Sequence, residues 1–297
     1  MHTPAKIFPF TWRASLRHSL VWIYQTFKKF FIRRHSRYFD LTPPFFLNHI
    51  IYDSKKHSAF RITIRDLVDY STLQQIYIWE SYRLKDLRRF DEIMELYTRQ
   101  VNAGLQPLII DCGANIGLAA KYFSQEFPES KIIAIEPEEG NVTVANINNS
   151  RTANVSILKA AIAATDTKGK LINLDHGNNS CQVTEDAQGT VEMISINSLI
   201  ATCERENTNT WPFIVKIDIE GFENELFSRN VDWVERFPIL IIELHDSIFL
   251  KHGYSRNFLT VIGKLDRDFI YIGENIFSIC NQFGSAAEGT NRPMALV

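Results

Sequence analysis

Short apolar runs separated by helical stretches dominate the chain from residue 107 onward. The runs predict strands at 107–111, 131–136, 154–159, 213–218, 238–243, 269–273 and 276–280. Apolar runs of this length are typical of buried strands when amphipathic helices lie between them. Strands that alternate with helices form right-handed crossovers and a mostly parallel sheet. The pattern therefore predicts an α/β fold whose last two strands form an antiparallel hairpin.

The N-terminal region has a different pattern. Between Trp12 and Phe30, apolar residues recur at three- and four-residue steps, which predicts a helix that ends before Pro43-Pro44. Residues 1–40 contain eight Lys/Arg and one acidic residue. Such a helix either lies on an anionic membrane surface or docks on its own domain or on a second copy of the chain. We expect the docked helix, so a homo-oligomer and a peripheral membrane contact both stay open.

Residues 45–105 are expected to form a helical cap that takes part in substrate binding. Residues 60–64 alternate like a short strand, and residues 73–97 have the spacing of one or two helices. The expected organisation is thus a basic amphipathic segment at 1–44, a helical cap at 45–105, and an α/β domain at 106–297.

Composition narrows the class of protein. The formal net charge of -2 gives no reason to expect nucleic acid as a partner. Four scattered cysteines without a CxxC pair argue against a disulfide framework or a zinc site and favour a reducing cytoplasm. No apolar run reaches the roughly 18 residues that a transmembrane helix needs. We therefore expect a cytoplasmic protein.

An acid and two glycines follow the strand at 107–111. Gly113 and Gly117 form a strand-to-helix turn, where a missing Cβ lets the backbone approach a ligand. The dinucleotide fingerprint G-x-G-x-x-G is not met, because Asn115 and Leu118 occupy two of its glycine positions. Asp111 would repel a pyrophosphate but could accept hydrogen bonds from an ammonium group. S-adenosylmethionine, which has an amino-acid end and no phosphate, fits this turn.

A second acid lies at the end of the next strand. Glu136 follows the run at 131–135, where a carboxylate can accept hydrogen bonds from both hydroxyls of a ribose. Taken singly, Asp111 could cap the following helix and Glu136 could be a solvated strand end. Their matching positions around a glycine turn favour one ligand site.

Four segments, Ile109–Gly117, Ile135–Pro137, Val215–Glu223 and Ile241–His245, resemble the FkbM family of methyltransferases. The resemblance covers residues 107–245, about half of the chain. It implies a class I seven-stranded methyltransferase fold and methyl transfer to a hydroxyl of a sugar or natural product. Carried over residue by residue, it implies that Asp111, Gly113, Asn115, Gly117 and Glu136 form the S-adenosylmethionine site. We also expect Asp218 in that site and Ala161 where this fold usually passes the adenine ring, although helix packing explains a small residue at 161 equally well.

Methyl transfer to a hydroxyl benefits from a base that removes the proton. We expect His245 in this role because its unperturbed pKa lies near neutral pH. Asp218 or Glu243 would orient it or bind the acceptor, although His245 could equally be structural. A divalent cation held by these side chains is the alternative, but no compact ligand motif supports it, so no metal is expected. The rival functions are a non-catalytic binding module and an NAD-dependent oxidoreductase.

Overall fold

The protein is described by a computed structural model, which covers residues 37–173, 181–248 and 250–282. The helix expected between Trp12 and Phe30 lies outside these residues. The chain divides into two compact units, Met1–Glu80 and Ser81–Val297. Within the described ranges, no helix is both long and apolar enough to cross a bilayer.

The first unit contains a three-stranded antiparallel sheet. Its strands are β1 (Tyr38–Asp40), β2 (Asn48–Asp53) and β3 (Ser58–Thr63), in that order. Helix α2 (Leu67–Leu73) and a π-helical turn, η1 (Gln74–Ile78), follow. The expected boundaries at 44 and 105 differ from this division. The pairing of β1 with β2 places residues on both sides of position 44 in one sheet, so the region is not purely a helical cap.

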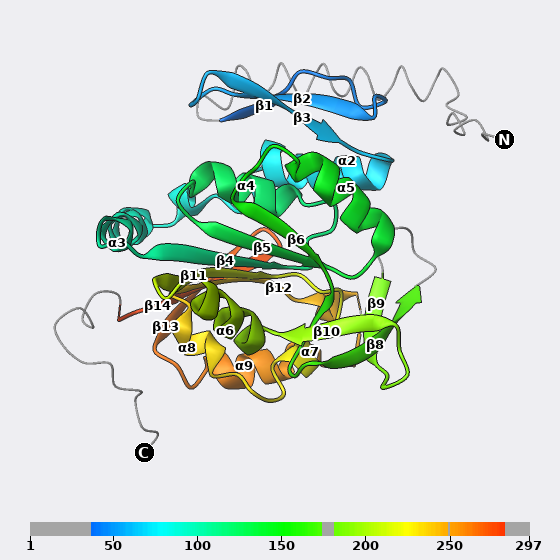
Figure 1. The fold of residues 1–297 in the computed structure, drawn as a ribbon, viewed down its shortest axis with the longest axis vertical. Coiled ribbons are helices and arrows are strands. Elements are labelled where there is room, and N and C mark those ends of the chain that lie inside the picture. The colour runs from blue at the N-terminus through cyan, green and yellow to red at the C-terminus, as the bar shows by residue number, and fades with distance from the viewer. Residues whose placement is uncertain (1–36, 174–180, 249, 283–297) are drawn as a thin grey trace. The chain divides into compact units, whose positions relative to one another are not determined.

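The second unit is built on a seven-stranded mixed sheet (Figure 1). Its order is β13 (Arg267–Ile272), β14 (Asn275–Cys280), β12 (Ile239–Glu243), β11 (Thr210–Ile217), β4 (Gln106–Cys112), β5 (Lys131–Glu136) and β6 (Val155–Lys159). Only β14 runs antiparallel to the others. The expected mostly parallel sheet with a final hairpin is therefore confirmed. The strand order reverses beside β4, where such sheets bind ligands beyond their carboxyl ends.

Helices cover both faces of this sheet, which explains the continuous apolar strands. Figure 1 shows α4 (Leu118–Glu126) and α5 (Glu139–Asn149) on one face. The other face is covered by α6 (Ile196–Glu206), α8 (Trp233–Arg236) and α9 (Arg256–Ile262). Fully buried Val215, Phe258 and Trp233 belong to the core on that face.

A smaller four-stranded sheet follows β6. Its order is β7 (Ala161–Ala163), β10 (Val191–Ser195), β8 (Thr167–Asn173) and β9 (Cys181–Glu185). Two short elements complete the site region: α7 (Glu223–Leu226) and the 3₁₀ turn η3 (His245–Ser247). These lie after β11 and β12, so both begin at the carboxyl edge of the large sheet.

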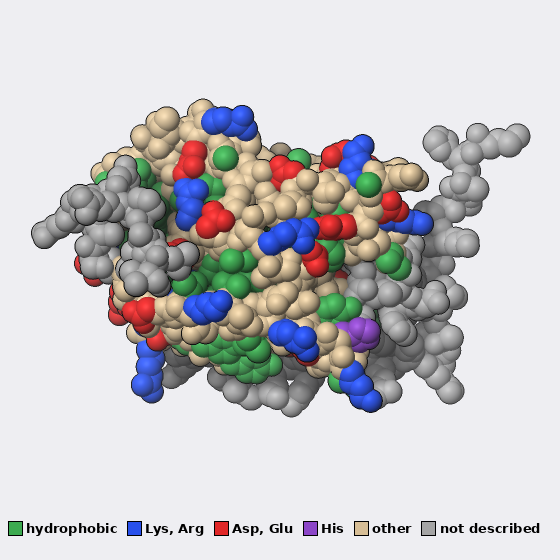
Figure 2. Space-filling view, turned by 90° about the horizontal axis from the view of Figure 1, so that it is seen from below, with side chains coloured by type: hydrophobic (Ala, Val, Ile, Leu, Met, Phe, Trp, Pro, Cys, Tyr) green, Lys and Arg blue, Asp and Glu red, His purple; other side chains and the backbone are tan. Residues whose placement is uncertain are grey.

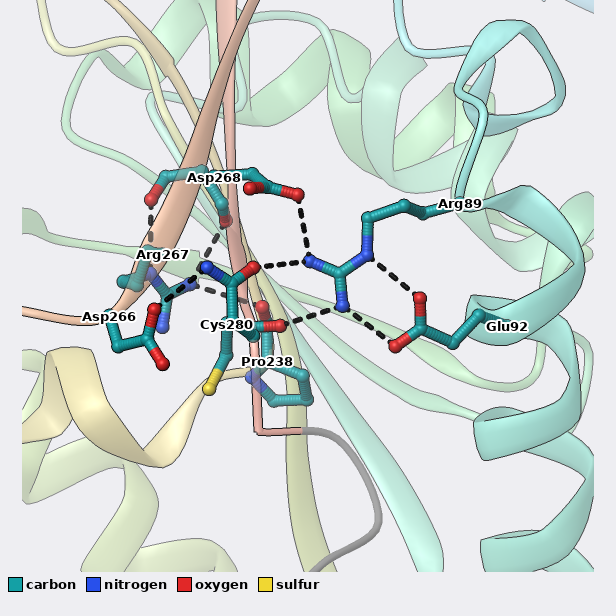
Figure 3. Close-up of polar contacts among 9 residues, drawn as sticks. Arg89, Glu92, Pro238, Asp266, Arg267, Asp268 and Cys280 are labelled. Carbon is teal, nitrogen blue, oxygen red and sulfur yellow. Dashed lines mark hydrogen bonds and ion pairs between the residues drawn. The ribbon is translucent and has the colours of Figure 1, made fainter.

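Arg89, which precedes α3 (Phe90–Asn102), forms hydrogen bonds with the antiparallel strands β13 and β14 at the edge of the sheet (Figure 3). Its guanidinium donates to Glu92, to Asp268 of β13 and to the carbonyl oxygen of Cys280. Beside it, half-buried Arg267 donates to the carbonyl oxygens of Phe237 and Pro238. The two arginines thus satisfy backbone acceptors where the last strands end.

One face of the molecule shows no concentration of a single charge. In Figure 2, lysine and arginine side chains are interspersed with aspartates and glutamates. A nucleic-acid site would show clustered basic side chains. The expectation that the chain binds no nucleic acid stays a prediction.

Candidate functional site

A cavity lies where β4, β5 and β11 end. Its lining includes five of the seven residues expected to bind a cofactor: Gly113, Asn115, Glu136, Ala161 and Asp218. Apolar side chains of Ile162, Val183 and Phe222 form further parts of the wall. Three acidic side chains (Glu136, Asp218 and Glu220) and a largely apolar remainder suit a ligand that has both a ring system and polar groups.

The turn after β4 requires glycine at position 113. Gly113 has a φ of 77°, and a Cβ there would lie 1.8 Å from the carbonyl oxygen of Asp218. The backbone amides of Gly113 and Ala114 both donate to the carbonyl oxygen of Ile135. This turn is therefore pressed between the ends of β5 and β11, and only a residue without a side chain fits.

Glu136 is nearly fully buried and holds the rim of the cavity together. Its carboxylate accepts hydrogen bonds from the backbone amides of Asn115 at 2.8 Å and Glu138 at 3.0 Å, and from Asn141 Nδ2 at 3.2 Å. Burial raises the pKa of Glu136, and the three donors oppose that effect. The residue is thus both a cavity wall and the support of the glycine turn.

Asp111 does not line the cavity. It is fully buried, and its Oδ1 lies 3.1 Å from Nζ of Lys216, which also donates to the carbonyl oxygen of Gly113 at 2.7 Å. Burial lowers the pKa of Lys216, but the charge and hydrogen bond of Asp111, together with Tyr82 and Asp218, outweigh burial and raise this pKa well above its usual value. We therefore correct its role to support of the turn.

Gly117 also lies outside the cavity lining. It precedes α4 with a φ of 75°, and a Cβ there would lie 2.5 Å from Nδ2 of Asn149 and 3.0 Å from Cβ of Ala145. Both neighbours belong to α5. The structure thus assigns Gly117 to the close packing of two helices, in place of the expected ligand contact.

The expected catalytic residues come together around His245. Its Nε2 lies 3.6 Å from Oδ1 of Asp218, 3.6 Å from Oε2 of Glu220 and 3.9 Å from Oε1 of Glu243. On the opposite side of the ring, Nδ1 lies 2.8 Å from Oε1 of Glu223. His245 is buried, whereas Asp218 and Glu220 are partly exposed and line the cavity.

This concentration of carboxylates shifts several pKa values. Burial lowers the pKa of His245, but the hydrogen bond and charge of Glu223, with the charge of Asp218, outweigh burial and raise it to about 9. Burial and then the charge of Asp218 raise the pKa of Glu220 to about 7 and that of Glu243 to about 8. In the ligand-free protein, His245 is therefore an imidazolium at neutral pH and not the neutral base expected from its unperturbed pKa.

Two residues of the site were not singled out from the sequence. Lys216 interrupts the apolar run of β11, and a charge inside a buried strand signals a buried partner of opposite charge. Its strand neighbour in the parallel register is Asp111. Glu223 carries no comparable signal, because an acid in the first turn of a helix is common at the positive end of the helix dipole.

Comparisons with known proteins add a family match. The methyltransferase FkbM domain matches residues 111–271. Hexuronic acid methyltransferase AglP of Haloferax volcanii is 22% identical over 196 residues, which are 64% of this chain and 78% of that protein. The human methyltransferase 10 domain containing protein is matched at 10% identity and a TM-score of 0.35, over 64% of this chain and 80% of that one. A crystal structure of WbdD is matched at 12% identity and a TM-score of 0.35. The match covers 66% of this chain and 41% of the WbdD chain.

Proposed function

Because the chain belongs to the FkbM family of methyltransferases, we propose that it transfers a methyl group from S-adenosylmethionine to a hydroxyl oxygen of a sugar or natural-product acceptor. The observation that supports this most directly is the position of Glu136 in the cavity wall beside the Gly113 turn. A carboxylate there can accept hydrogen bonds from both hydroxyls of a ribose.

The residues of the cavity fit S-adenosylmethionine. Ala161 and Ile162 offer small and apolar surface for an adenine ring, while Asp218 offers a carboxylate for the ammonium group. Gly113 lines the cavity, and its missing side chain leaves room for the backbone of Asp218 beside the turn. When bound, S-adenosylmethionine supplies an already activated methyl group, so the chain's own task is to align the acceptor oxygen and remove its proton.

We assign the removal of the proton to Glu243. His245 and Glu243 both have raised pKa values, of about 9 and about 8, so each must lose a proton before it can accept one, and Glu243 does so at the lower pH. Glu243 ends β12 beside the same cluster and is partly exposed. Once ionised, Glu243 would accept the hydroxyl proton on a carboxylate oxygen, and S-adenosylmethionine, when bound, would supply the methyl group. His245, held by Glu223, provides positive charge beside these acids.

The relative from Haloferax volcanii supports a carbohydrate acceptor, because its name states that it methylates a hexuronic acid. We extend this to the present chain as a proposal. The first acceptors to test are therefore glycosides of hexuronic acids, followed by the corresponding neutral sugars. A methylated product would be identified by a mass increase of one methylene unit, and its position by linkage analysis.

Calorimetric titration with S-adenosylhomocysteine tests the cofactor assignment without an acceptor. We expect the wild type to bind. Glu136→Gln should have a dissociation constant roughly ten- to a hundred-fold larger, since a charge-assisted hydrogen bond contributes about 1.5–3 kcal/mol. Glu129→Gln changes the same charge at an exposed position and serves as the matched control. Binding of NAD in place of S-adenosylhomocysteine would overturn the proposal.

A further inference from the structure

Three side chains of metal-binding type meet at the edge of the cavity. One ligand atom each from Asp218, Glu220 and His245 lies within 4.8 Å of the other two. We propose that these residues bind a divalent cation, with Mn²⁺ as the best match. The proposal of a metal site rests on the positions of these three side chains. It does not depend on whether the protein transfers a methyl group.

The orientation of His245 is the observation that points to an ion. Glu223 holds Nδ1 at 2.8 Å, which turns Nε2 toward Asp218 and Glu220. Nε2 is 3.6 Å from each of their nearest oxygens, longer than a hydrogen bond. A histidine that binds a metal almost always donates its other ring nitrogen to a carboxylate or carbonyl group, as Nδ1 does here. The ring is buried, and Asp218, Glu220 and Glu243 all lie within 4 Å of Nε2.

The composition of the site selects the ion. Two carboxylates suit Mg²⁺, Ca²⁺ and Mn²⁺, whereas an imidazole is a ligand of the transition metals. Mn²⁺ accepts both. Asp218 and Glu220 are partly exposed toward the cavity, so further coordination positions would face the space where an acceptor binds.

The three ligands come from separated parts of the sequence. For this reason they do not form a compact motif that sequence analysis could recognise. Asp218 follows β11, Glu220 lies in the turn before α7, and His245 begins η3 after β12. Parallel strands bring these positions to one edge of the sheet. The expectation of no metal rested on sequence spacing alone.

The role of the ion rests on the proposed methyltransferase function. An acceptor with two neighbouring oxygens, such as a vicinal diol or a 2-hydroxy acid, could coordinate the open positions. Such chelation would fix one hydroxyl next to the cavity and compensate the negative charge of the surrounding carboxylates. The ion would displace the imidazolium proton from Nε2 of His245, so His245 would be a neutral ligand and the ion would supply the positive charge in its place. Glu243 would be left to accept the proton of the acceptor hydroxyl. The acceptor class follows from this: adjacent oxygen atoms are required.

Binding of Mn²⁺ alone tests the site independently of any reaction. Full-length protein is treated with EDTA, dialysed and titrated with Mn²⁺, while the electron paramagnetic resonance signal of the free ion is recorded. We expect one bound ion per chain, and at least about tenfold weaker binding in Asp218→Asn and Glu220→Gln. Glu223→Gln should weaken binding roughly ten- to a hundred-fold through the orientation of His245. The matched control is Glu225→Gln, on the same helix but facing Arg229.

Electron spin echo modulation of the bound ion provides a test that needs no substitution. Coupling to an imidazole nitrogen is expected if His245 is a ligand. An unchanged signal of free Mn²⁺, or bound Mn²⁺ without nitrogen coupling, would overturn the site even if S-adenosylhomocysteine binds. Mn²⁺ binding without S-adenosylhomocysteine binding would instead retain the site and overturn the proposed function.

Discussion

Glu223 lies 2.8 Å from Nδ1 of His245, although 22 residues separate the two in the sequence. Both side chains are buried. The contact joins the first residue of α7 to the turn that follows β12, and it sets the direction in which the other ring nitrogen faces. A buried carboxylate at this distance also stabilises the charged form of the imidazole.

Replacing Glu223 with glutamine should lower the pKa of His245 from about 9, because the amide keeps a hydrogen-bonding group but removes the charge. A raised pKa in the folded state contributes stability that is fully present below the unfolded value of 6.5 and lost as pH rises through about 9. The wild type should therefore lose stability over this window more steeply than the variant. Imidazole NMR in EDTA-treated protein measures the pKa, and Glu225→Gln should leave it unchanged. Equal pKa values in wild type and Glu223→Gln would contradict the assignment.

Lys216→Met should destabilise the fold by roughly 3–5 kcal/mol, because it leaves the buried carboxylate of Asp111 without its partner. The double variant Lys216→Met, Asp111→Leu should recover much of this loss. Urea denaturation measures both. Lys168→Met, which removes an exposed ion pair with Glu192, is the control and should change stability little. If the double variant is no more stable than Lys216→Met, the ion pair is not the cause.

The affinity for S-adenosylhomocysteine should fall on acidification at a pH above the ordinary 4.5 of a glutamate, because burial raises the pKa of Glu136. Only the ionised carboxylate can accept hydrogen bonds from both ribose hydroxyls. Calorimetry across this pH range should show the fall in wild type and in Glu129→Gln, but not in Glu136→Gln. A pH dependence that persists in Glu136→Gln would assign the titration to another group.

Gly113→Ala should be more harmful than Gly104→Ala. Both glycines have a positive φ, of 77° and 82°, and the left-handed backbone costs an alanine roughly 1–2 kcal/mol at either site. Only at position 113 would the new Cβ meet the backbone of Asp218; at position 104, nothing lies within 4 Å. Thermal unfolding should separate the two variants, and only Gly113→Ala should lose S-adenosylhomocysteine binding. Equal melting temperatures would show that the turn can relax.

Arg89→Ala should destabilise the protein by roughly 1–3 kcal/mol, since it removes hydrogen bonds to Asp268 and to the carbonyl oxygen of Cys280 (Figure 3). Arg88→Ala changes the neighbouring exposed residue and should have little effect. Urea denaturation is the measurement. A loss of equal size in both variants would indicate a general effect of charge instead of these contacts.

The sequence predicted the large sheet well because each of its strands is a local apolar run. The expected strands at 107–111 and 131–136 became Gln106–Cys112 and Lys131–Glu136. The small strands β7 and β9 were missed. β7 has only three residues, and a run that short gives no measurable period. In the first unit, the expected strand at 60–64 is β3, whereas β1 and β2 were missed, because strand pairing across 38–63 depends on partners that no single segment reveals.

By itself, the sequence determined the fold class, the glycine turn and the position of Glu136, because strand period and turn chemistry act over a few neighbouring residues. Tertiary structure alone decided which acids face the cavity. Glu136 ends β5, whereas Asp111 lies one residue before the end of β4 and pairs with Ala134 of β5. Only Glu136 reaches the cavity, and the register places Lys216 beside Asp111. It also gathered Glu220, Glu223 and His245 at one sheet edge. Their charges and pKa values depend on distances through space, and no spacing along the chain contains those distances.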